Sequence, residues 1–330
     1  MYPSHSFAHL TCVILSLSSA SNAYYLSKTY NASNFFKDFT FFSATDPTKG
    51  FVEYESLANA EAAGLAYTSD NQVYLGVDHT TVNPKNGRAS VRLESKQAWG
   101  QGTPRNPSHH TPKYADISGV FIADIEHMPG GICGVWPAFW MFGPNWPNSG
   151  EIDIIEGVNA DTTDTITLHT AAGCNVSSSA LKTGTMVTTD GNQDDAGTGC
   201  STSTPNTNNY GKGFNNIGGG VYAMQWASSG ISVWFWSRAS IPADITVNDI
   251  DVASWGTSLA NFSGSGCDFD TFFANQSIIF DTTFCGSWAG NIWSSGSCAS
   301  LASTCDAYVA ANPSAFTNAY WLINSVQVWQ

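Results

Sequence analysis

Short runs of hydrophobic residues, many of them alternating with polar residues, follow one another along most of the chain. They are rich in Val, Ile, Phe, Tyr and Trp, and clusters of Gly, Asn, Ser and Pro separate them. Alternation with a period of two is typical of a β-strand that buries one face. We predict strands in ASVRLES, GVFIADIEHM, GVWPAFWMFG, EIDIIEGV, TITLHT, GVYAMQWA, ISVWFWSRA, SIIFDTTF and YWLINSVQVW. A hairpin turn is predicted at residues 228–230.

Helical periodicity is scarce and is confined to two segments. YESLANAEAAGLAY (residues 54–67) is bounded by Gly64, and SCASLASTCDAYVAANP (residues 297–313) stops at Pro313. Many short strands without alternating helices indicate an all-β sandwich or barrel. We predict one domain over residues 24–330, because such sandwiches often exceed 150 residues. The polar segment 186–214 is predicted to be an insertion at the edge of a binding face.

The first residues, MYPSHSFAHLTCVILSLSSASNAYY, contain an apolar run followed by small residues. This pattern predicts a signal peptide, residues 1–23, that is cleaved after Ala23. The alternative is a buried first strand. No later segment has the apolar length of a membrane span, so we expect a secreted, extracellular protein.

The cysteines and sequons fit secretion. Seven of the eight cysteines lie beyond the predicted signal peptide, which predicts three disulfides and one free thiol. We expect Cys133, in an apolar run, to be the free thiol. Cys174 with Cys200 would close a polar loop, and Cys285, Cys298 and Cys305 are close enough for local pairing. Glycan attachment is predicted at four N-x-S sequons: Asn31, Asn175, Asn261 and Asn275.

The charge balance narrows the class of partner. The formal charge of −14 and the pI near 4.6 argue against nucleic acid and anionic membrane surfaces, which need a basic footprint. Aromatic residues make up 13% of the chain, and flat apolar rings with hydrogen-bonding groups suit neutral sugars. No cysteine or histidine spacing indicates a metal site, so no cofactor is expected, and a structural calcium ion is not indicated. A monomer is expected.

Three acids lie within six positions of one another in SGEIDIIEGVN, in a chain where only 12% of residues are charged. On a strand, Glu151 and Asp153 share one face, and regular alternation would place Glu156 on the other face with the isoleucines. One extra residue at Ile154 and Ile155, a β-bulge, returns Glu156 to the acid face. We therefore predict a bulge there, with Glu151 and Glu156 facing the same cleft.

Such a cluster suits glycosidase chemistry. Retaining glycosidases use two carboxyls about 5 to 5.5 Å apart. Like charges at short range do not all ionise, so one carboxyl keeps its proton as the acid, and Asp153 orients the nucleophile. A cation site and a plain acidic face stay open as alternatives.

Aromatic residues near the acids favour a carbohydrate cleft. Trp136, Trp140 and Trp146 lie just upstream, and His169, on the next predicted strand, is placed to face the acids. Taken singly, each Trp is more often a core residue than a cleft residue.

These motifs can be compared with a known family. GEIDIIEGVN resembles the E-x-D-x-x-E signature of glycoside hydrolase family 16, and GVWPAFWMFG and TLHTAAGC resemble its fungal secreted laminarinase branch. The similarity continues through GVYAMQWASSGISVWFW and FCGSWAGNIW. It implies a β-jelly roll of two antiparallel sheets with a concave glycan-binding cleft.

The resemblance also implies roles for individual residues. Glu151 would be the nucleophile, Asp153 the assisting acid and Glu156 the general acid/base. Substrate-binding roles are implied for Trp136, Trp140, Trp146, His169 and Trp288. The expected function is endo-hydrolysis of β-1,3-glucan, including mixed β-1,3/1,4-glucan, with retention. Alternatives are a transglycosylase of the same fold and a non-catalytic glucan-binding lectin.

Overall fold

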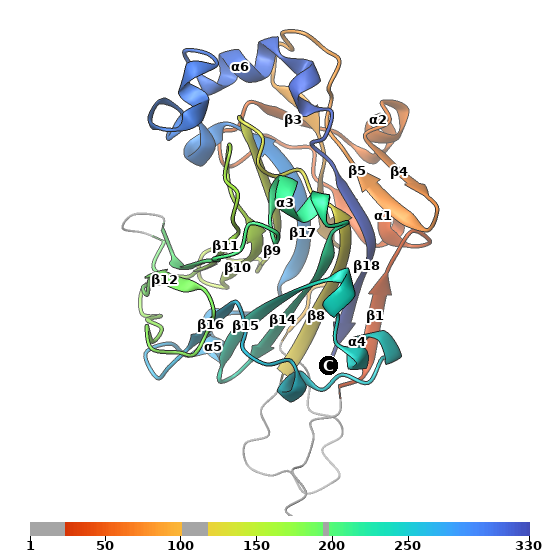
Figure 1. The fold of residues 1–330 in the computed structure, drawn as a ribbon. Helices are drawn as coiled ribbons and strands as arrows, with labels where there is room; N and C mark the ends of the chain where they lie inside the picture. The colour runs from red at the N-terminus through yellow and green to blue at the C-terminus, as the bar shows by residue number, and fades with distance from the viewer. Residues whose placement is uncertain (1–23, 101–117, 194–197) are drawn as a thin grey trace, which may run out of the picture.

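The computed structural model describes residues 24–100, 118–193 and 198–330 (Figure 1). Within these residues two eight-stranded antiparallel sheets dominate. We call the sheet that carries the three acids the acid sheet and the other the back sheet. The acid sheet has the order β12 (Thr185–Thr188), β13 (Cys200–Ser203), β11 (Thr165–His169), β10 (Glu151–Glu156), β9 (Val135–Phe142), β17 (Ser277–Phe284), β7 (Arg92–Ser95), β2 (Phe39–Phe41).

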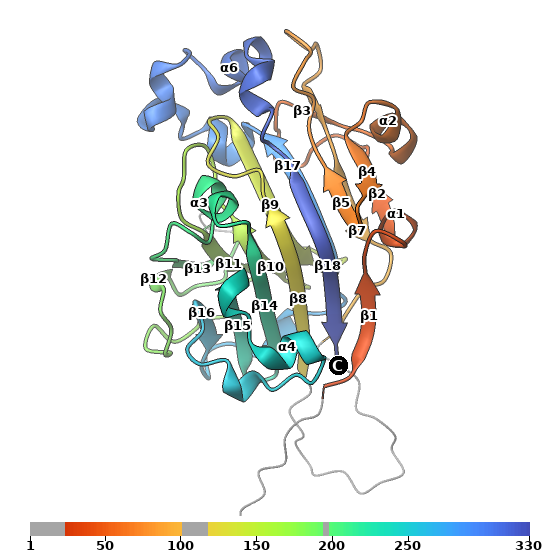
Figure 2. The ribbon, with the colours of Figure 1, turned by 45° about the vertical axis from the view of Figure 1, so that its right-hand side comes forward.

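The back sheet is seen face-on in Figure 2, where β14, β8 and β18 run side by side. Its order is β16 (Ala260–Ser263), β15 (Gly230–Ser237), β14 (Gly220–Ala227), β8 (Ser118–His127), β18 (Trp321–Trp329), β5 (Gln72–Leu75), β4 (Ala66–Ser69), with β1 (Leu26–Tyr30) also paired to β18. A parallel pair is formed by β3 (Val52–Tyr54) and β6 (Arg88–Ser90).

The core lies between the two sheets because the side chains of each strand alternate. Ile152 and Phe139 of the acid sheet belong to the same buried cluster as Phe121 and Met224 of the back sheet. The acids of β10 therefore lie on the outer face of the acid sheet. The outer face of the back sheet has its own cluster, in which Trp234 packs with residues of the 241–255 segment.

The predicted all-β sandwich of two antiparallel sheets is confirmed, and each predicted run contains a strand. The hairpin is also confirmed, because Ala227 pairs with Gly230. The predicted insertion 186–214 instead contributes most of β12 and all of β13, although it does lie at the edge of the acid sheet as expected. Its Ser- and Thr-rich strands have no apolar run, so hydrophobic periodicity did not reveal them.

Helices are short, and both predicted segments contain one. The α-helices are α1 (Phe35–Asp38), α2 (Leu57–Ala62), α3 (Gly211–Asn216), α4 (Ala243–Val247), α5 (Phe269–Phe272) and α6 (Cys305–Ala311). We call residues 285–316, which contain α6, the cap. The cap lies at one end of the sandwich, drawn in blue in Figure 1, over a cluster that includes Val135 and Phe284.

The predicted number of disulfides is confirmed, but most of the pairing was wrong. Cys133 is not free: it is bonded to Cys298 and joins the loop before β9 to the cap. Cys285 pairs locally with Cys305. Cys174 pairs with Cys267 because the Asn175 N–H bond to Gly266 O brings the two segments together. Among the cysteines that the structure describes, Cys200 is the free one, and burial raises the pKa of its thiol to about 12.

Among the described residues, no helix has the length and apolar character to cross a membrane. The predicted signal peptide lies outside the described residues. Of the four sequons, Asn175 and Asn275 are exposed, and Asn31 and Asn261 are half-buried.

Candidate active site

The bulge in β10 brings the three acids onto one face. Asp153 pairs with Trp140 of β9, but the next pairing is Ile155 with Phe139, so Ile154 is the extra residue. Ile154 and Ile155 are both buried. The predicted bulge is confirmed, and it places Glu156 opposite Ala138, on the face that carries Asp153 and Trp140.

Neighbouring strands complete this face. Glu151 lies opposite His169 of β11, and Asp153 lies opposite Thr167. On the other side of β9, β17 places Asp281 opposite Ala138. Ala138 thus lies between Glu156 and Asp281, and its small side chain leaves space between two acids.

Asp153 is buried between the other two acids, with 1% of its surface exposed. Burial, and then the charge of Glu151 and a hydrogen bond with it, raise the pKa of Asp153 well above its usual value. His169 Nε2 lies 3.4 Å from Asp153 Oδ2. His169 is therefore beside the acids as predicted, and Asp153 is placed to share a proton with Glu151.

Glu156 is also buried, with 9% of its surface exposed. Desolvation, and then the charge of Asp153, raise its pKa well above the usual range for a glutamate. The Trp136 indole donates a hydrogen bond of 2.9 Å to Glu156 Oε1, which opposes part of this rise. Its surroundings thus favour the protonated form of Glu156, whereas Glu151 is only half-buried.

The predicted tryptophans lie around the acids. The rings of Trp136 and Trp288 meet edge to face, with centroids 5.6 Å apart. The Trp146 indole N–H donates to Glu151 Oε2, and 47% of the Trp146 surface is exposed. Trp140 lies beside Asp153 and stacks on Phe142. All four indoles are at least partly exposed, so none is a fully buried core residue.

Two charged residues at this face were not predicted. Asp281 accepts hydrogen bonds from the indole of Trp140 (2.8 Å) and the hydroxyl of Tyr54 (3.0 Å). Burial raises the pKa of Asp281 to about 6, against the opposing charge of Arg92. The Arg92 guanidinium lies 5.0 Å from the Trp140 ring centroid. A signal for Asp281 was present in SIIFDTTF, where a single acid interrupts an apolar strand.

Three side chains on the acid face are of the kinds that bind a metal ion. Ligand atoms of Glu151, Asp153 and His169 lie within 4.8 Å of one another. Carboxylate and imidazole together suit Zn²⁺ or a similar transition ion better than Ca²⁺, which prefers oxygen. A second group, Cys285, Cys305 and Asp306, has no free thiol, because the two cysteines are bonded to each other.

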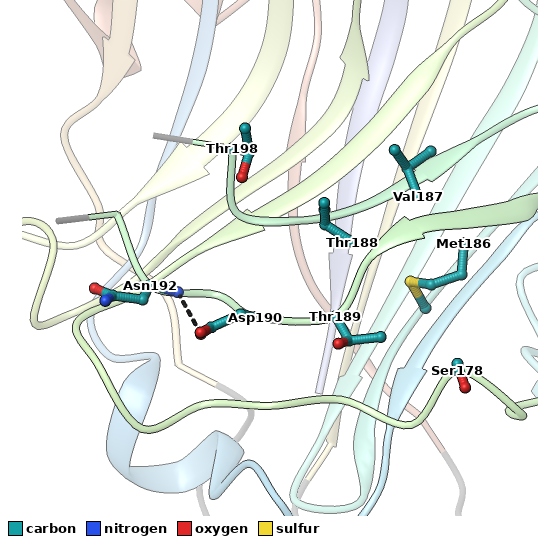
Figure 3. A pocket seen from close by; sticks show the side chains of 8 residues that line it. All are labelled: Ser178, Met186, Val187, Thr188, Thr189, Asp190, Asn192 and Thr198. Atoms are coloured by element: carbon teal, nitrogen blue, oxygen red, sulfur yellow. Dashed lines mark hydrogen bonds between the residues drawn. The ribbon is translucent and has the colours of Figure 1, made fainter. Parts of the chain in front are cut away.

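A surface hollow of about 460 Å³ lies beside β12, and none of the three acids lines it (Figure 3). Its lining side chains are Ser178, Met186, Val187, Thr188, Thr189, Asp190, Asn192 and Thr198. Asp190 accepts a hydrogen bond from the Asn192 N–H. With a single carboxyl, this hollow lacks the paired acids that catalysis on sugars requires.

A β-sandwich whose outer face carries clustered carboxyls beside partly exposed indoles is the kind of catalytic domain found in glycoside hydrolases. Comparison with known families gives the family: the model of the XgeA-like catalytic GH16 domain matches residues 39–329. The chain belongs to glycoside hydrolase family 16.

Curated relatives agree with this family. The chain is 42% identical over 318 residues to a probable endo-1,3(4)-β-glucanase of Aspergillus fumigatus, covering 94% of this chain and 46% of the relative. It is 39% identical to the endo-1,3(4)-β-glucanase xgeA of Emericella nidulans, covering 98% and 50%. The chain therefore spans about half the length of these relatives.

Solved structures share the fold over their full length. The GH16 Laminarinase 16A of Phanerochaete chrysosporium, solved with β-glucans in its donor and acceptor sites, matches with a TM-score of 0.84 and 39% identity. An elongating GH family 16 β-1,3-glucosyltransferase matches with a TM-score of 0.83 and 41% identity. Each match covers 93% of this chain and 100% of the other.

Proposed function

We propose that this chain is a secreted endo-β-glucanase that cleaves internal β-1,3 linkages of glucan, including mixed β-1,3/1,4-glucan, with retention of configuration. The observation that carries the proposal is the different setting of two acids on one face: Glu156 is buried and its pKa is raised, whereas Glu151 is only half-buried. Retaining hydrolysis needs one protonated and one nucleophilic carboxyl. The relatives named as endo-1,3(4)-β-glucanases support the choice of substrate.

In the first step, Glu151 attacks the anomeric carbon while Glu156 gives its proton to the leaving glycosidic oxygen. The products are a glycosyl ester on Glu151 and a shortened glucan. In the second step, ionised Glu156 takes a proton from water as the water attacks the same carbon and releases Glu151. Asp153, between the two, holds Glu151 in position through their shared proton.

Aromatic side chains on the acid face are proposed to bind the sugar rings. Trp136, Trp140, Trp146 and Trp288 are partly exposed around the acids, and His169 lies at the β11 side. Indole rings stack on the apolar faces of pyranose rings. Glucan is thus expected to lie across β10 and β9, with the scissile bond over Asp153. No metal is proposed to take part, and the chain is proposed to act as a monomer.

The test is digestion of a panel of β-1,3-glucan, mixed-linkage glucan, β-1,4-glucan and xyloglucan by the wild type and by Glu151→Ser. We expect cleavage of the first two by the wild type, with the β-anomer formed first in NMR spectra, and a loss of at least about 10³-fold in the variant. Full activity of Glu151→Ser, or first formation of the α-anomer, would refute the mechanism. Adding a metal chelator to the same assay is expected to leave the rate of glucan cleavage unchanged.

Transfer to a sugar acceptor requires the same acids, and a solved relative is named as a glucosyltransferase. The same panel, run with a high concentration of laminari-oligosaccharide acceptor, measures the ratio of elongated to hydrolysed product. We expect hydrolysis to dominate at low acceptor concentration. Elongated products dominating there would make the chain a transglycosylase.

A further inference from the structure

Asp164, at the turn that leads into β11, is fully buried and contacts the site from behind. Its Oδ1 accepts a hydrogen bond of 2.9 Å from the backbone N–H of Glu156. Its Oδ2 lies 3.0 Å from the hydroxyl of Tyr222 in β14. Asp164 therefore connects the proposed acid/base residue to the back sheet.

The position of Asp164 follows from the strand register. The pairing of β10 with β11 ends at Asp153 and Thr167. If the ladder continued in the same register, Asp164 would lie opposite Glu156, but the bulge and the end of β11 interrupt it. The Asp164 side chain thus takes the N–H of Glu156 that the backbone of β11 leaves without a partner.

The hydrogen bonds of the Tyr222 hydroxyl depend on the protonation state of Asp164. The Tyr222 hydroxyl also lies 2.5 Å from the backbone carbonyl of Asn209. A carbonyl oxygen only accepts, and Tyr222 has one proton to donate. If Tyr222 donates to Asn209, the 3.0 Å contact with Asp164 is a hydrogen bond only when Asp164 Oδ2 carries a proton and donates it.

We propose that Asp164 is a positioning residue that works as a neutral carboxylic acid: its carbonyl oxygen holds the backbone of Glu156, and its proton links it to Tyr222. This inference rests on the proposed role of Glu156 as acid/base. It gives the end of β10 a fixed anchor just after the bulge. Since it adds no charge, it does so without opposing the ionisation of Glu156 in the second step.

The surroundings of Asp164 support the neutral form. No ion pair within the described residues includes Asp164. The titratable groups near it are acids and phenols: Asp153 and Glu156 of β10, Asp161 of the same turn, Tyr210 before α3, and Tyr222 of β14. Burial raises the pKa of Asp164 to about 8, although the N–H of Glu156 and the hydroxyl of Tyr222 oppose the rise.

Two substitutions at Asp164 distinguish the effect of its hydrogen bonds from the effect of its ionisation. Asp164→Asn keeps an oxygen for the Glu156 N–H and supplies an N–H for Tyr222, but it cannot ionise. Asp164→Ala removes both contacts. Asp161→Asn is the matched control, because it removes a carboxylate from the same turn. The Asp161 carboxylate accepts a hydrogen bond from the Val158 N–H and not from Glu156.

The variants are compared on β-1,3-glucan and on an aryl β-glucan oligosaccharide whose leaving group needs no protonation. Asp164→Asn and Asp161→Asn are expected to keep the wild-type kcat on both. Asp164→Ala is expected to lose about 10- to 100-fold in kcat on glucan, with KM little changed, and most of this loss should disappear on the aryl substrate. A loss of folded protein would lower both rates equally.

The proton on Asp164 is tested without any substrate. Infrared spectra of protein with ¹³C-labelled aspartate are recorded at pH 6, and the Asp164→Asn spectrum is subtracted from that of the wild type. We expect a difference band of a protonated carboxyl, and a band of a carboxylate instead would overturn the proposal. So would an inactive but folded Asp164→Asn, or an Asp164→Ala with full kcat. If the wild type cleaves no β-glucan, the proposed function fails, and the infrared result still decides the state of Asp164.

Discussion

At the residue scale, Trp136 and Trp140 show how one strand serves two acids. They lie four positions apart on β9, and the indole of Trp136 donates to Glu156, whereas that of Trp140 donates to Asp281. A hydrogen bond donated to a carboxyl stabilises its ionised form and lowers its pKa. The Trp136 indole therefore affects the titration of Glu156 and the Trp140 indole that of Asp281, although both lie on the same face of the sheet.

Trp136→Phe is expected to move the alkaline limb of the pH dependence of kcat/KM to higher pH, by about one unit. The substitution removes the N–H but keeps a ring, so the pKa of Glu156 rises further and the acid stays protonated longer. The measurement is kcat/KM on β-1,3-glucan from pH 3 to 10. Trp140→Phe is the control and should leave this limb in place. An unmoved limb in Trp136→Phe would show that Glu156 is not the titrating acid.

The sequence alone was sufficient for the three acids and for Trp136, Trp140 and Trp146, because they occur close together in the chain, whereas Trp288 was named only through the family resemblance. It was not sufficient for Arg92 or Asp281, which strand pairing brings to the site from distant positions. Asp164 lies only eight residues after Glu156, but a turn separates the two and periodicity does not give the direction of its side chain. The pairing of Cys133 was missed because Cys298 lies 165 residues away.

At the element scale, the bulge in β10 decides whether the acids act together. Inserting one alanine between Ile155 and Glu156 would shift the phase of the strand by one residue and turn Glu156 toward the core, or pull the strand out of register. We expect the insertion to abolish activity on β-1,3-glucan and to lower the melting temperature. Ile154→Val keeps the residue count, so it should cost only about 1 kcal/mol and retain activity. An insertion variant with wild-type activity would contradict this role of the strand phase at the bulge.

Apolar strands such as β9, β14 and β17 were predictable because most of their residues are buried and therefore apolar. The edge strands β12 and β13 were not, since Ser and Thr fill most of their positions. The cap could be predicted only as one helical segment. Its position is set by the disulfides Cys133–Cys298 and Cys285–Cys305, which act over distances that local patterns do not encode.

At the scale of the whole molecule, the buried acids determine how stability changes with pH. Asp281 and Asp164 have pKa values raised to about 6 and about 8, well above those of the unfolded chain. The folded state therefore binds more protons than the unfolded state between about pH 4 and these values. The free energy of unfolding should then fall as pH rises, by up to about 1.4 kcal/mol per pH unit for each group.

The expected result is a melting temperature that is highest near pH 4 to 5 and decreases towards pH 8. Differential scanning calorimetry over this range measures it. In Asp164→Asn the decrease should be smaller, because one of the titrating groups is gone. A melting temperature that increased from pH 5 to 8 would show that these acids are ionised in the folded protein.

The burial of Asp153 and Glu156 has one more consequence, for the evolution and engineering of the chain. Burying two carboxyl groups in the interior of a protein lowers its stability. Amides of the same shape would remove part of this cost. Asp153→Asn and Glu156→Gln should therefore raise the melting temperature at pH 8, by more than at pH 5, while they remove activity. Selection for thermal stability alone would be expected to discard these acids first, so stabilised variants must be screened for catalysis at every round.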